Sequence, residues 1–427
     1  MYDIMKRTSL TLLVGFMVLI LPISIVFAAS TSGTSIVHMD FLNNPSAYDE
    51  IALSGNGDYL VVGEHAAVGD GNITLYDVPK SFTGGITTKW SIDTTDVYTL
   101  RIDDDGSHIL AVDGTDDTLT CYGKDGITPL WSITAPNDMS GAWMSDNGDY
   151  VAYYDTTFSG LRFHLISGAD KSVLWSQTIT SGVDDVAVSN SGHVVMADLS
   201  DAVHYYNTTE EVWVNNSIPT VCQVDINNAG DRIVVNAIES GQDMAILFDN
   251  AGNLLNKYDE LRLSTVGVAM ARDSNDIILS TYANTPSKVA LVSGDSMQEQ
   301  WSKTTDVNNY HSKISADGRV GLITDYGEDI SIYDCVAGER IMLHETDEWK
   351  RSMDLSDDGS FVAVILNDGR LFVYSVNIDT SGAGAFLDNL IDTFTNMDNL
   401  FGLLITLGVG VAIGSLIFGL RGRSKGA

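Results

Sequence analysis

The chain has 427 residues, with 23 lysines and arginines against 57 aspartates and glutamates, and its formal net charge is −34. Nucleic-acid proteins need clustered basic side chains to contact phosphates, so this balance excludes a nucleic-acid partner. Intrinsic disorder is excluded as well, because 44% of the residues are hydrophobic and only 19% are charged, which allows a large core.

Residues 1–29 have the pattern of an export signal. Lys6 and Arg7 form a short basic region, an apolar stretch covers 10–27, and small residues follow it. We predict a signal peptide that is cut after Ala28, which places the rest of the chain outside the cytoplasm. An N-terminal anchor that is not cleaved is the alternative.

The central part of the chain repeats itself. A turn of the form Ser-x-Asp/Asn-Gly, as in Ser145-Asp146-Asn147-Gly148, recurs between two apolar runs. Glycine accepts the positive φ of a tight turn, and Asp or Asn bonds to nearby backbone. The glycine position recurs every 38 to 49 residues, near the period of propeller blades, at Gly57, Gly106, Gly148, Gly192, Gly230, Ser274 (a degenerate copy), Gly318 and Gly359.

Two further markers keep the same phase. An aromatic residue lies near the end of the third predicted strand in most units, namely Tyr76, Tyr122, Phe163, Tyr205, Phe248, Tyr333 and Tyr374. The fourth strand often carries a tryptophan, at Trp90, Trp131, Trp175, Trp213 and Trp301, with Tyr258 near the skipped position. Four short strands per unit, repeated eight times, predict an all-β fold, an eight-bladed β-propeller. Seven blades plus an irregular piece is the alternative.

The predicted propeller domain is 30–378. Its last unit has only three predicted strands, ending near Val376. The segment from Ser35 to Met39 precedes the first unit and has strand character. We expect it to supply the missing outer strand and so to close the ring, which removes an exposed sheet edge.

These repeats resemble PQQ-like (quinoprotein-type) and WD40-like propeller repeats, through the turns above and through Leu-Trp-Ser at 130–132 and 174–176. The resemblance covers about residues 35–376 and implies the fold, but not the function, because propellers host many activities. Quinone-dependent dehydrogenases, as that family implies, carry adjacent cysteines and dense cofactor ligands. The three cysteines here lie far apart, so we expect buried free thiols and neither PQQ nor another cofactor; they are Cys121, Cys222 and Cys335.

Four segments follow the propeller. Residues 379–384 are typical of a linker, and 385–400 of an amphipathic helix that lies on the membrane or packs on the propeller. Residues 401–420 contain no charge over a length that matches a bilayer core, which predicts a transmembrane helix. The basic tail 421–427 should stay in the cytoplasm, so the propeller should lie outside the cell.

Candidate metal and modification sites are few. Two Asp-rich loops, 68–72 and 103–106, faintly resemble calcium loops, but neither has the spacing of a complete oxygen cage and a turn role explains them more simply. The calcium candidates are Asp70, Asp103 and Asp105. The eight histidines show no zinc spacing. Three triplets match the N-glycosylation pattern, at Asn72, Asn207 and Asn215.

Acidic residues gather in the loops at one predicted face of the propeller. Loops between second and third strands share that face with the loops that join blades. We expect a negative face that attracts a basic partner or divalent cations. A solvated surface is the alternative, since the opposite turns are acidic too. The candidates are Glu64, Asp93, Asp96, Asp117, Asp155, Asp201, Asp243, Glu328, Asp329 and Asp368.

These patterns predict a membrane-anchored propeller on the cell surface that works by binding a protein or glycan, in adhesion or as an envelope scaffold. The alternative is an extracytoplasmic enzyme with its site in the central channel, such as a quinoprotein-like dehydrogenase or a glycan-active hydrolase or lyase. No catalytic residue is predicted, because no nucleophile elbow or phosphate loop is present. The predicted inner strands near 186–188, 268–270 and 353–355 are mostly apolar, which argues against a catalytic channel.

Overall fold

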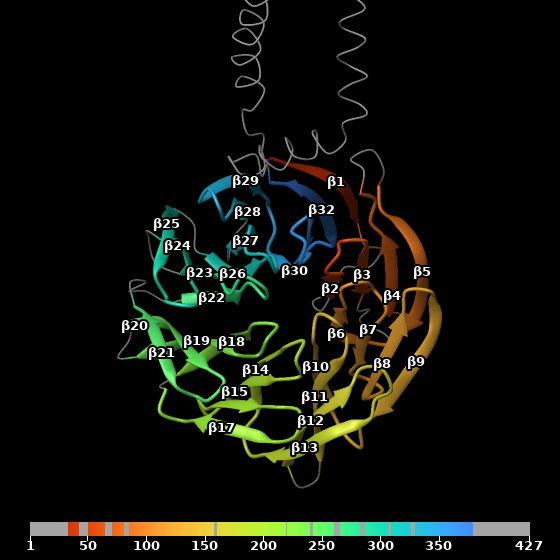
Figure 1. Ribbon diagram of the computed structural model, residues 1–427. Coiled ribbons are helices and arrows are strands. Elements are labelled where there is room, and N and C mark those ends of the chain that lie inside the picture. The colour runs from red at the N-terminus through yellow and green to blue at the C-terminus, as the bar shows by residue number, and fades with distance from the viewer. Residues whose placement is uncertain are drawn as a thin grey trace, which may run out of the picture. The chain divides into compact units, whose positions relative to one another are not determined.

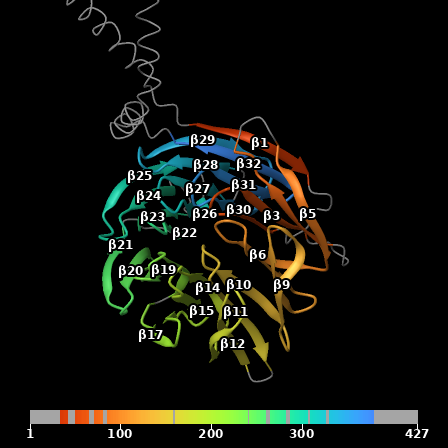
Figure 2. The ribbon, with the colours of Figure 1, turned by 45° about the vertical axis from the view of Figure 1, so that its right-hand side comes forward.

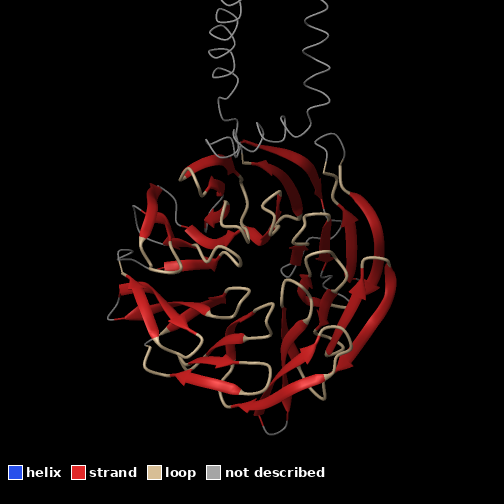
Figure 3. Ribbon diagram, viewed as in Figure 1, coloured by secondary structure: helices blue, strands red, loops and turns tan. Residues whose placement is uncertain are grey.

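Eight four-stranded antiparallel sheets surround a central channel as the blades of a β-propeller (Figure 1). In this computed structural model the described residues are 33–41, 50–64, 71–80, 85–157, 160–218, 220–239, 242–259, 265–281, 287–305, 309–325 and 329–378. Strands, red in Figure 3, make up the blades, and short loops connect them. The prediction of an all-β, eight-bladed propeller is confirmed.

In blades 1 to 7, chain order runs from the inner to the outer strand. Figure 2 shows the inner strands β10 and β14 towards the middle and the outer strands β5 and β9 at the rim. Blades 1 to 4 consist of β2 (Glu50–Leu53), β3 (Tyr59–Glu64), β4 (Gly71–Asp77) and β5 (Thr87–Thr94); β6 (Val97–Ile102), β7 (Ile109–Asp113), β8 (Thr118–Gly123) and β9 (Gly126–Thr134); β10 (Met139–Met144), β11 (Tyr150–Thr157), β12 (Gly160–Ser167) and β13 (Val173–Ile179); and β14 (Val183–Val188), β15 (Val194–Asp198), β16 (Val203–Tyr206) and β17 (Glu211–Asn215). Blades 5 to 8 consist of β18 (Val221–Ile226), β19 (Arg232–Glu239), β20 (Gln242–Asp249) and β21 (Leu254–Tyr258); β22 (Thr265–Met270), β23 (Ile277–Thr281), β24 (Ser287–Val292) and β25 (Glu299–Thr305); β26 (Asn309–Ile314), β27 (Val320–Asp325), β28 (Asp329–Asp334) and β29 (Glu339–Glu345); and β30 (Lys350–Leu355), β31 (Phe361–Leu366), β32 (Arg370–Asn377) and β1 (Gly33–Phe41).

The N-terminal strand β1 closes the ring. It pairs antiparallel with β32, with Gly33 opposite Asn377 and Phe41 opposite Arg370, and becomes the outermost strand of blade 8. The predicted closure by the segment before the first repeat is therefore confirmed. Because the closing strand is held by backbone pairing, the ring is sealed without a covalent link.

The ring has two faces. The turn face carries the turns between first and second strands and between third and fourth strands. The loop face carries the loops between second and third strands and the connections between blades. Gly33 and Asn377 pair with each other at the turn face, where Val376 N–H donates to Ser360 O (2.8 Å) in the first turn of blade 8. Both ends of the propeller therefore leave it at one face.

In five of the eight repeats a buried serine builds the first turn from inside. In blade 1, Ser54 Oγ accepts the N–H of Tyr59 (3.0 Å) and donates to Asn56 Oδ1 (2.8 Å). Such a hydroxyl satisfies backbone groups that the turn would otherwise leave unpaired. The equivalent serines are all fully buried, namely Ser54, Ser145, Ser189, Ser315 and Ser356.

The glycine of each repeat takes the backbone conformation that the motif predicts. The seven motif glycines have φ between 66° (Gly57) and 80° (Gly192). In the degenerate copy of blade 6, Asn275 takes the positive φ instead, at 64°. Asparagine tolerates this region better than other side chains, which explains how the turn survives without glycine.

The core consists of separate apolar layers between neighbouring blades. Tyr205 of blade 4, for example, packs in one cluster with Val235 and Phe248 of blade 5. The tryptophans of the fourth strands also link neighbouring blades, because the indole N–H of each donates to a backbone carbonyl of the next blade. These bonds are Trp90 to Lys124 (3.2 Å), Trp131 to Gly168 (2.6 Å), Trp175 to Asn207 (2.8 Å), Trp213 to Asn250 (3.3 Å) and Trp301 to Cys335 (2.6 Å). At the skipped position, the Tyr258 hydroxyl donates to Glu299 of the next blade.

The predicted segments at both chain ends, 1–29 and 379–427, lie outside the described residues. Within the described residues, no helix is long and apolar enough to cross a membrane. Cys121 and Cys335 are buried free thiols, as expected, and burial raises the pKa of Cys121 to about 12.

Candidate functional site: the channel and the two faces

The central channel is a cavity of about 440 Å³ bounded by the inner strands of all eight blades. Its lining carries many charges. The mostly apolar segments 186–188, 268–270 and 353–355 do line the channel, but neighbouring positions of the inner strands and first turns are ionic. The charged lining residues are Glu50, Arg101, Asp104, Asp146, Asp185, Asp225, Arg272, Lys313, Lys350, Arg351, Asp354 and Asp357.

Several channel carboxylates serve the backbone. The inner strand of each blade is a sheet edge, so its N–H groups on the channel side have no partner within the sheet. A carboxylate of the preceding blade accepts some of these N–H groups. The bonds are Asp354 Oδ2 to Leu53 (2.8 Å), Asp225 Oδ2 to Met270 (2.8 Å) and Asp185 Oδ2 to Val224 (3.0 Å).

Neighbouring first turns bond to one another and form a closed ring at the turn face. Asn56 N–H donates to Asp104 O (2.9 Å), and Asp104 N–H donates to Asp146 O (2.7 Å). The links continue through the remaining blades and return where Asp358 N–H donates to Gly55 O (2.9 Å). Each first turn is therefore held by both of its neighbours.

Arg272 of blade 6 crosses this end of the channel. Its guanidinium lies 3.3 Å from Asp225 Oδ1 in blade 5 and 3.7 Å from Asp146 Oδ2 in blade 3, and its Nη1 donates to Ile226 O (2.6 Å). Burial acts to lower the pKa of Arg272, but Asp225 and Asp146 raise it above its ordinary value. The bridge therefore ties together blades that are three positions apart in the ring.

Beside this bridge two carboxyl groups meet over Gly55. A Cβ at Gly55 would lie 2.3 Å from Asp104 Oδ1 and 2.6 Å from Asp357 Oδ2, so the glycine makes room for both. Burial raises the pKa of Asp104 to about 6. Burial, together with the nearby charges of Asp146 and Asp104, raises the pKa of Asp357 well above its ordinary value. The pair therefore keeps a proton in mildly acidic solution.

Stability should fall as pH rises through neutrality, and Asp185 should contribute. Burial raises the pKa of Asp185 to about 7 from an ordinary value of 3.8. The folded protein thus holds a proton that the unfolded chain has lost, so this stabilisation is complete below pH 3.8 and is lost as pH rises through about 7. In Asp185→Asn, the difference in unfolding free energy between pH 5 and pH 8 should shrink by roughly 2 kcal/mol, measured by chemical denaturation. A variant whose pH profile matches that of the parent would contradict this assignment.

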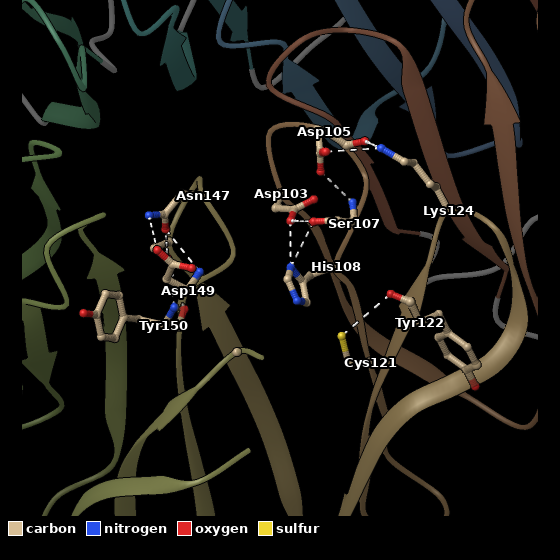
Figure 4. Close-up of polar contacts among 12 residues, drawn as sticks. Asp103, Asp105, Ser107, His108, Cys121, Tyr122, Lys124, Asn147, Asp149 and Tyr150 are labelled. Carbon is tan, nitrogen blue, oxygen red and sulfur yellow. Dashed lines mark hydrogen bonds and ion pairs between the residues drawn. The ribbon is translucent and has the colours of Figure 1, made fainter. Parts of the chain in front are cut away.

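The two calcium candidates that the structure describes have partners within their own blade (Figure 4). Asp103 Oδ2 accepts a hydrogen bond from Ser107 Oγ (2.7 Å) and lies 2.8 Å from His108 Nδ1. Asp105 accepts the N–H of Ser107 (2.9 Å) and forms an ion pair with Lys124 (3.2 Å). These contacts fit the turn role that was the alternative to calcium binding.

Of the remaining candidate metal and glycosylation residues, one lies outside the described residues and the others have partners within their own blades. Asp70 is outside the described residues, and in the described ranges no group of three or more His, Cys, Asp or Glu is placed to hold a metal ion. The asparagines of the three glycosylation triplets bond within their own blades, as Asn72 Nδ2 to Glu64 Oε2 (3.2 Å), Asn207 Oδ1 to Thr209 N–H (2.7 Å) and Asn215 Oδ1 to Ser217 N–H (3.0 Å).

The predicted acidic residues of the loop face differ in exposure. Glu64, Asp96 and Asp155 are buried, with exposed fractions of 7%, 7% and 5%, so they offer little to a partner. Of the other seven, Asp93 is exposed, while Asp117, Asp201, Asp329 and Asp368 are half-buried, and the side chains of Asp243 and Glu328 are not described. Further exposed carboxylates of this face are Asp116, Asp138, Asp184 and Asp347.

The sequence reasoning missed the residues of the channel. Arg272 and Asp146 occupy the x position of the Ser-x-Asp/Asn-Gly turn, and Asp104 and Asp357 occupy the same position in their blades. Reading this one position across all eight repeats would have identified the end of the channel, because equivalent residues of a closed ring lie around its axis.

No known protein family and no curated protein matches this sequence. Solved structures do match. The C-terminal WD40 domain of Sif2 is similar with a TM-score of 0.65 at 13% identity, over 81% of this chain and 99% of that one. The fold is that of the WD40-like and PQQ-like propellers. BamB from Moraxella catarrhalis, a PQQ-like propeller, has a TM-score of 0.56 at 15% identity, over 80% of this chain and 99% of that one.

A third similar propeller is Sqt1 from Chaetomium thermophilum, solved bound to the N-terminus of the ribosomal protein L10. Its TM-score is 0.62 at 12% identity, over 78% of this chain and 98% of that one. Identities this low establish the fold alone. At that level the resemblance read from the repeats is confirmed.

Proposed function

We propose that the protein is a binding module, anchored to the cell membrane, that docks a basic protein segment on its loop face. The observation that carries this proposal is the place of the propeller's two ends. Gly33 and Asn377 leave together at the turn face of blade 8. A membrane segment attached beyond the C-terminal end would draw that face towards the bilayer and leave the loop face open to the surroundings.

Charge supports a basic partner. The loop face keeps exposed carboxylates on blades 1 to 4 and 8, namely Asp93, Asp116, Asp138, Asp184 and Asp347. Long-range attraction by a surface of one sign speeds the encounter with a partner of the opposite sign. Sqt1, which has a similar fold, was solved with the N-terminus of a ribosomal protein, and this supports a protein segment as the partner.

The alternative, an enzyme with its site in the channel, has less support. The channel carboxylates Asp185, Asp225 and Asp354 accept backbone N–H groups, and Asp225 also pairs with Arg272. A general acid or base needs a free path to substrate and a proton it can exchange. Side chains that close the inner edges of the blades are better suited to hold the scaffold rigid.

The docking proposal is tested with a fluorescent decalysine peptide and the full-length protein in detergent, by fluorescence anisotropy at low and physiological salt. Reversing two loop-face charges, Asp93→Lys with Asp116→Lys, should weaken binding about tenfold at low salt. The matched control reverses two exposed turn-face charges, Asp125→Lys with Asp295→Lys, and should weaken it no more than about threefold through the change in net charge.

If the two double variants lose the same affinity, binding of the peptide depends on net charge alone, and the loop face is not the docking surface.

The outward location of the loop face is tested separately with Asp116→Cys, which should react with a membrane-impermeant maleimide on intact cells. The parent protein, which carries the native Cys121, Cys222 and Cys335, is the control for background labelling, and its buried Cys121 and Cys335 should stay unlabelled. A variant that reacts only after lysis would contradict the proposed topology.

A further inference from the structure

A large share of the protein's few positive charges lies in the channel. Five of the chain's 23 lysines and arginines line this one cavity, beside seven of its 57 aspartates and glutamates. One of them, Arg272, belongs to the bridge at the turn face. The other four are Arg101, Lys313, Lys350 and Arg351. They come from blades 2, 7 and 8, which lie on the same side of the ring around blade 1.

The turn-face end of this cavity is occupied by protein. Arg272 spans it between Asp225 and Asp146, and the carboxyl groups of Asp104 and Asp357 fill the space over Gly55. The hydrogen-bonded ring of first turns surrounds these groups. The cavity is therefore a well with its floor at the turn face, and a ligand would enter from the loop face.

The basic side chains line the wall above this floor. Arg101 and Lys313 both lie near Glu50 of blade 1, since each acts to lower the pKa of that carboxyl group. Arg351 marks the entrance, because its Nη2 donates to Asn367 Oδ1 (2.8 Å) in the loop between second and third strands of blade 8. The Nε of Arg351 is buried and has no hydrogen-bond partner.

The carboxylates on this side of the well are already engaged. Asp354 uses Oδ2 for the N–H of Leu53 and Oδ1 for the ion pair with Lys313 (3.3 Å). Glu50 accepts a hydrogen bond from Ser352 Oγ (3.4 Å), and burial raises its pKa so that it gives up its proton less readily. An incoming anion would thus meet the guanidinium groups of Arg101 and Arg351 and would share Lys313 with Asp354.

We propose that the channel binds a small polyvalent anion, a molecule with carboxylate or phosphate groups, held by Arg101, Lys313 and Arg351. A cavity of about 440 Å³ falls in the range of small-molecule sites and accommodates a ligand of this kind. Guanidinium groups favour carboxylates and phosphates because their N–H donors match the paired oxygens. The site is separate from the proposed docking surface, whose carboxylates lie at the loop face outside the channel.

The test is isothermal titration of the full-length protein in detergent at low salt, with citrate and with inorganic phosphate as probes. We expect one saturable site for at least one probe, with a Kd below about 1 mM. The probe that binds more tightly shows whether the site prefers carboxylate or phosphate groups. Lys313→Gln and Arg351→Gln should each weaken binding about tenfold, whereas Lys303→Gln, an exposed lysine on the outer strand β25, should leave it unchanged.

Absence of saturable binding by both probes would overturn the proposal, and so would equal weakening in the Lys303→Gln control. If Lys313→Gln does not fold, as judged by circular dichroism, Arg101→Gln carries the same expectation from the opposite side of Glu50. Binding of the decalysine peptide should be the same within twofold in all of these variants, so failure here leaves the docking proposal standing and the reverse also holds.

Discussion

Replacing Arg272 by methionine is expected to lower the free energy of unfolding by about 3 kcal/mol, the cost of leaving partly buried carboxylates without their cation. Methionine keeps most of the length and apolar volume but supplies no charge and no donor. Asp146 and Asp225, from blades 3 and 5, would then face each other across the end of the channel unpaired. Chemical denaturation monitored by tryptophan fluorescence measures the loss.

The effect of this substitution should also depend on pH. Without Arg272 the pKa of Asp146, which burial already raises, rises further, because the arginine is the main group that lowers it. A carboxyl group whose pKa is raised on folding stabilises below its unfolded pKa and loses that contribution as pH rises, so the deficit should be larger at pH 8 than at pH 5.

The matched control is Arg319→Met, which removes an exposed arginine paired with Asp317 (3.4 Å) at the turn face of blade 7. An exposed ion pair of this kind should contribute less than about 1 kcal/mol. If the two variants lose the same free energy of unfolding at both pH values, the cross-channel bridge contributes no more to stability than an exposed ion pair does.

The second large effect is expected at Gly168, in the turn between β12 and β13. A Cβ at this position would lie 1.8 Å from the carbonyl oxygen of Gly148, which is backbone and cannot rotate away. Gly168 also accepts the indole N–H of Trp131 (2.6 Å), so any shift of its backbone strains the contact between blades 2 and 3. Gly168→Ala should therefore cost about 3 kcal/mol, at the upper end of overpacking effects, as measured by thermal and chemical unfolding.

Gly126→Ala is the control for Gly168→Ala. Gly126 begins β9 at the equivalent edge of blade 2, and a Cβ there meets nothing within 4 Å. The change should alter stability by no more than about 0.5 kcal/mol. A destabilisation of Gly126→Ala as large as that of Gly168→Ala would show that loss of glycine itself, and not the contact with Gly148, is responsible.

The architecture could be predicted from the sequence because each repeat carries its own local instructions. A buried serine, a residue that tolerates positive φ and two apolar strands specify one hairpin without help from distant residues. The spacing of these turns then predicts eight repeats. The last repeat lacks a fourth strand, so another part of the chain must supply it. Even the degenerate copy follows this logic, since Asn275 replaces the glycine at the strained position.

The candidate site could not be predicted in the same way. An aspartate in a turn looks the same in sequence whether it bonds to side chains of its own turn, as Asp103 does, or lies at the end of the channel, as Asp104 does. The predicted acidic face shows the same difficulty, because Glu64 and Asp155 lie at strand ends and turn inward. Exposure depends on how neighbouring blades pack, which no single repeat contains.

The sequence by itself determined the number of blades, the chemistry of their turns and the strand that closes the ring, because these follow from contacts within a repeat or between the two ends of a periodic pattern. Only the tertiary structure decided which charges face the axis. Arg272 and Asp146 are distant in sequence and three blades apart, and ring closure alone brings them within 3.7 Å. The channel, with its bridged floor and basic wall, is therefore a property of the closed circle and of no repeat alone.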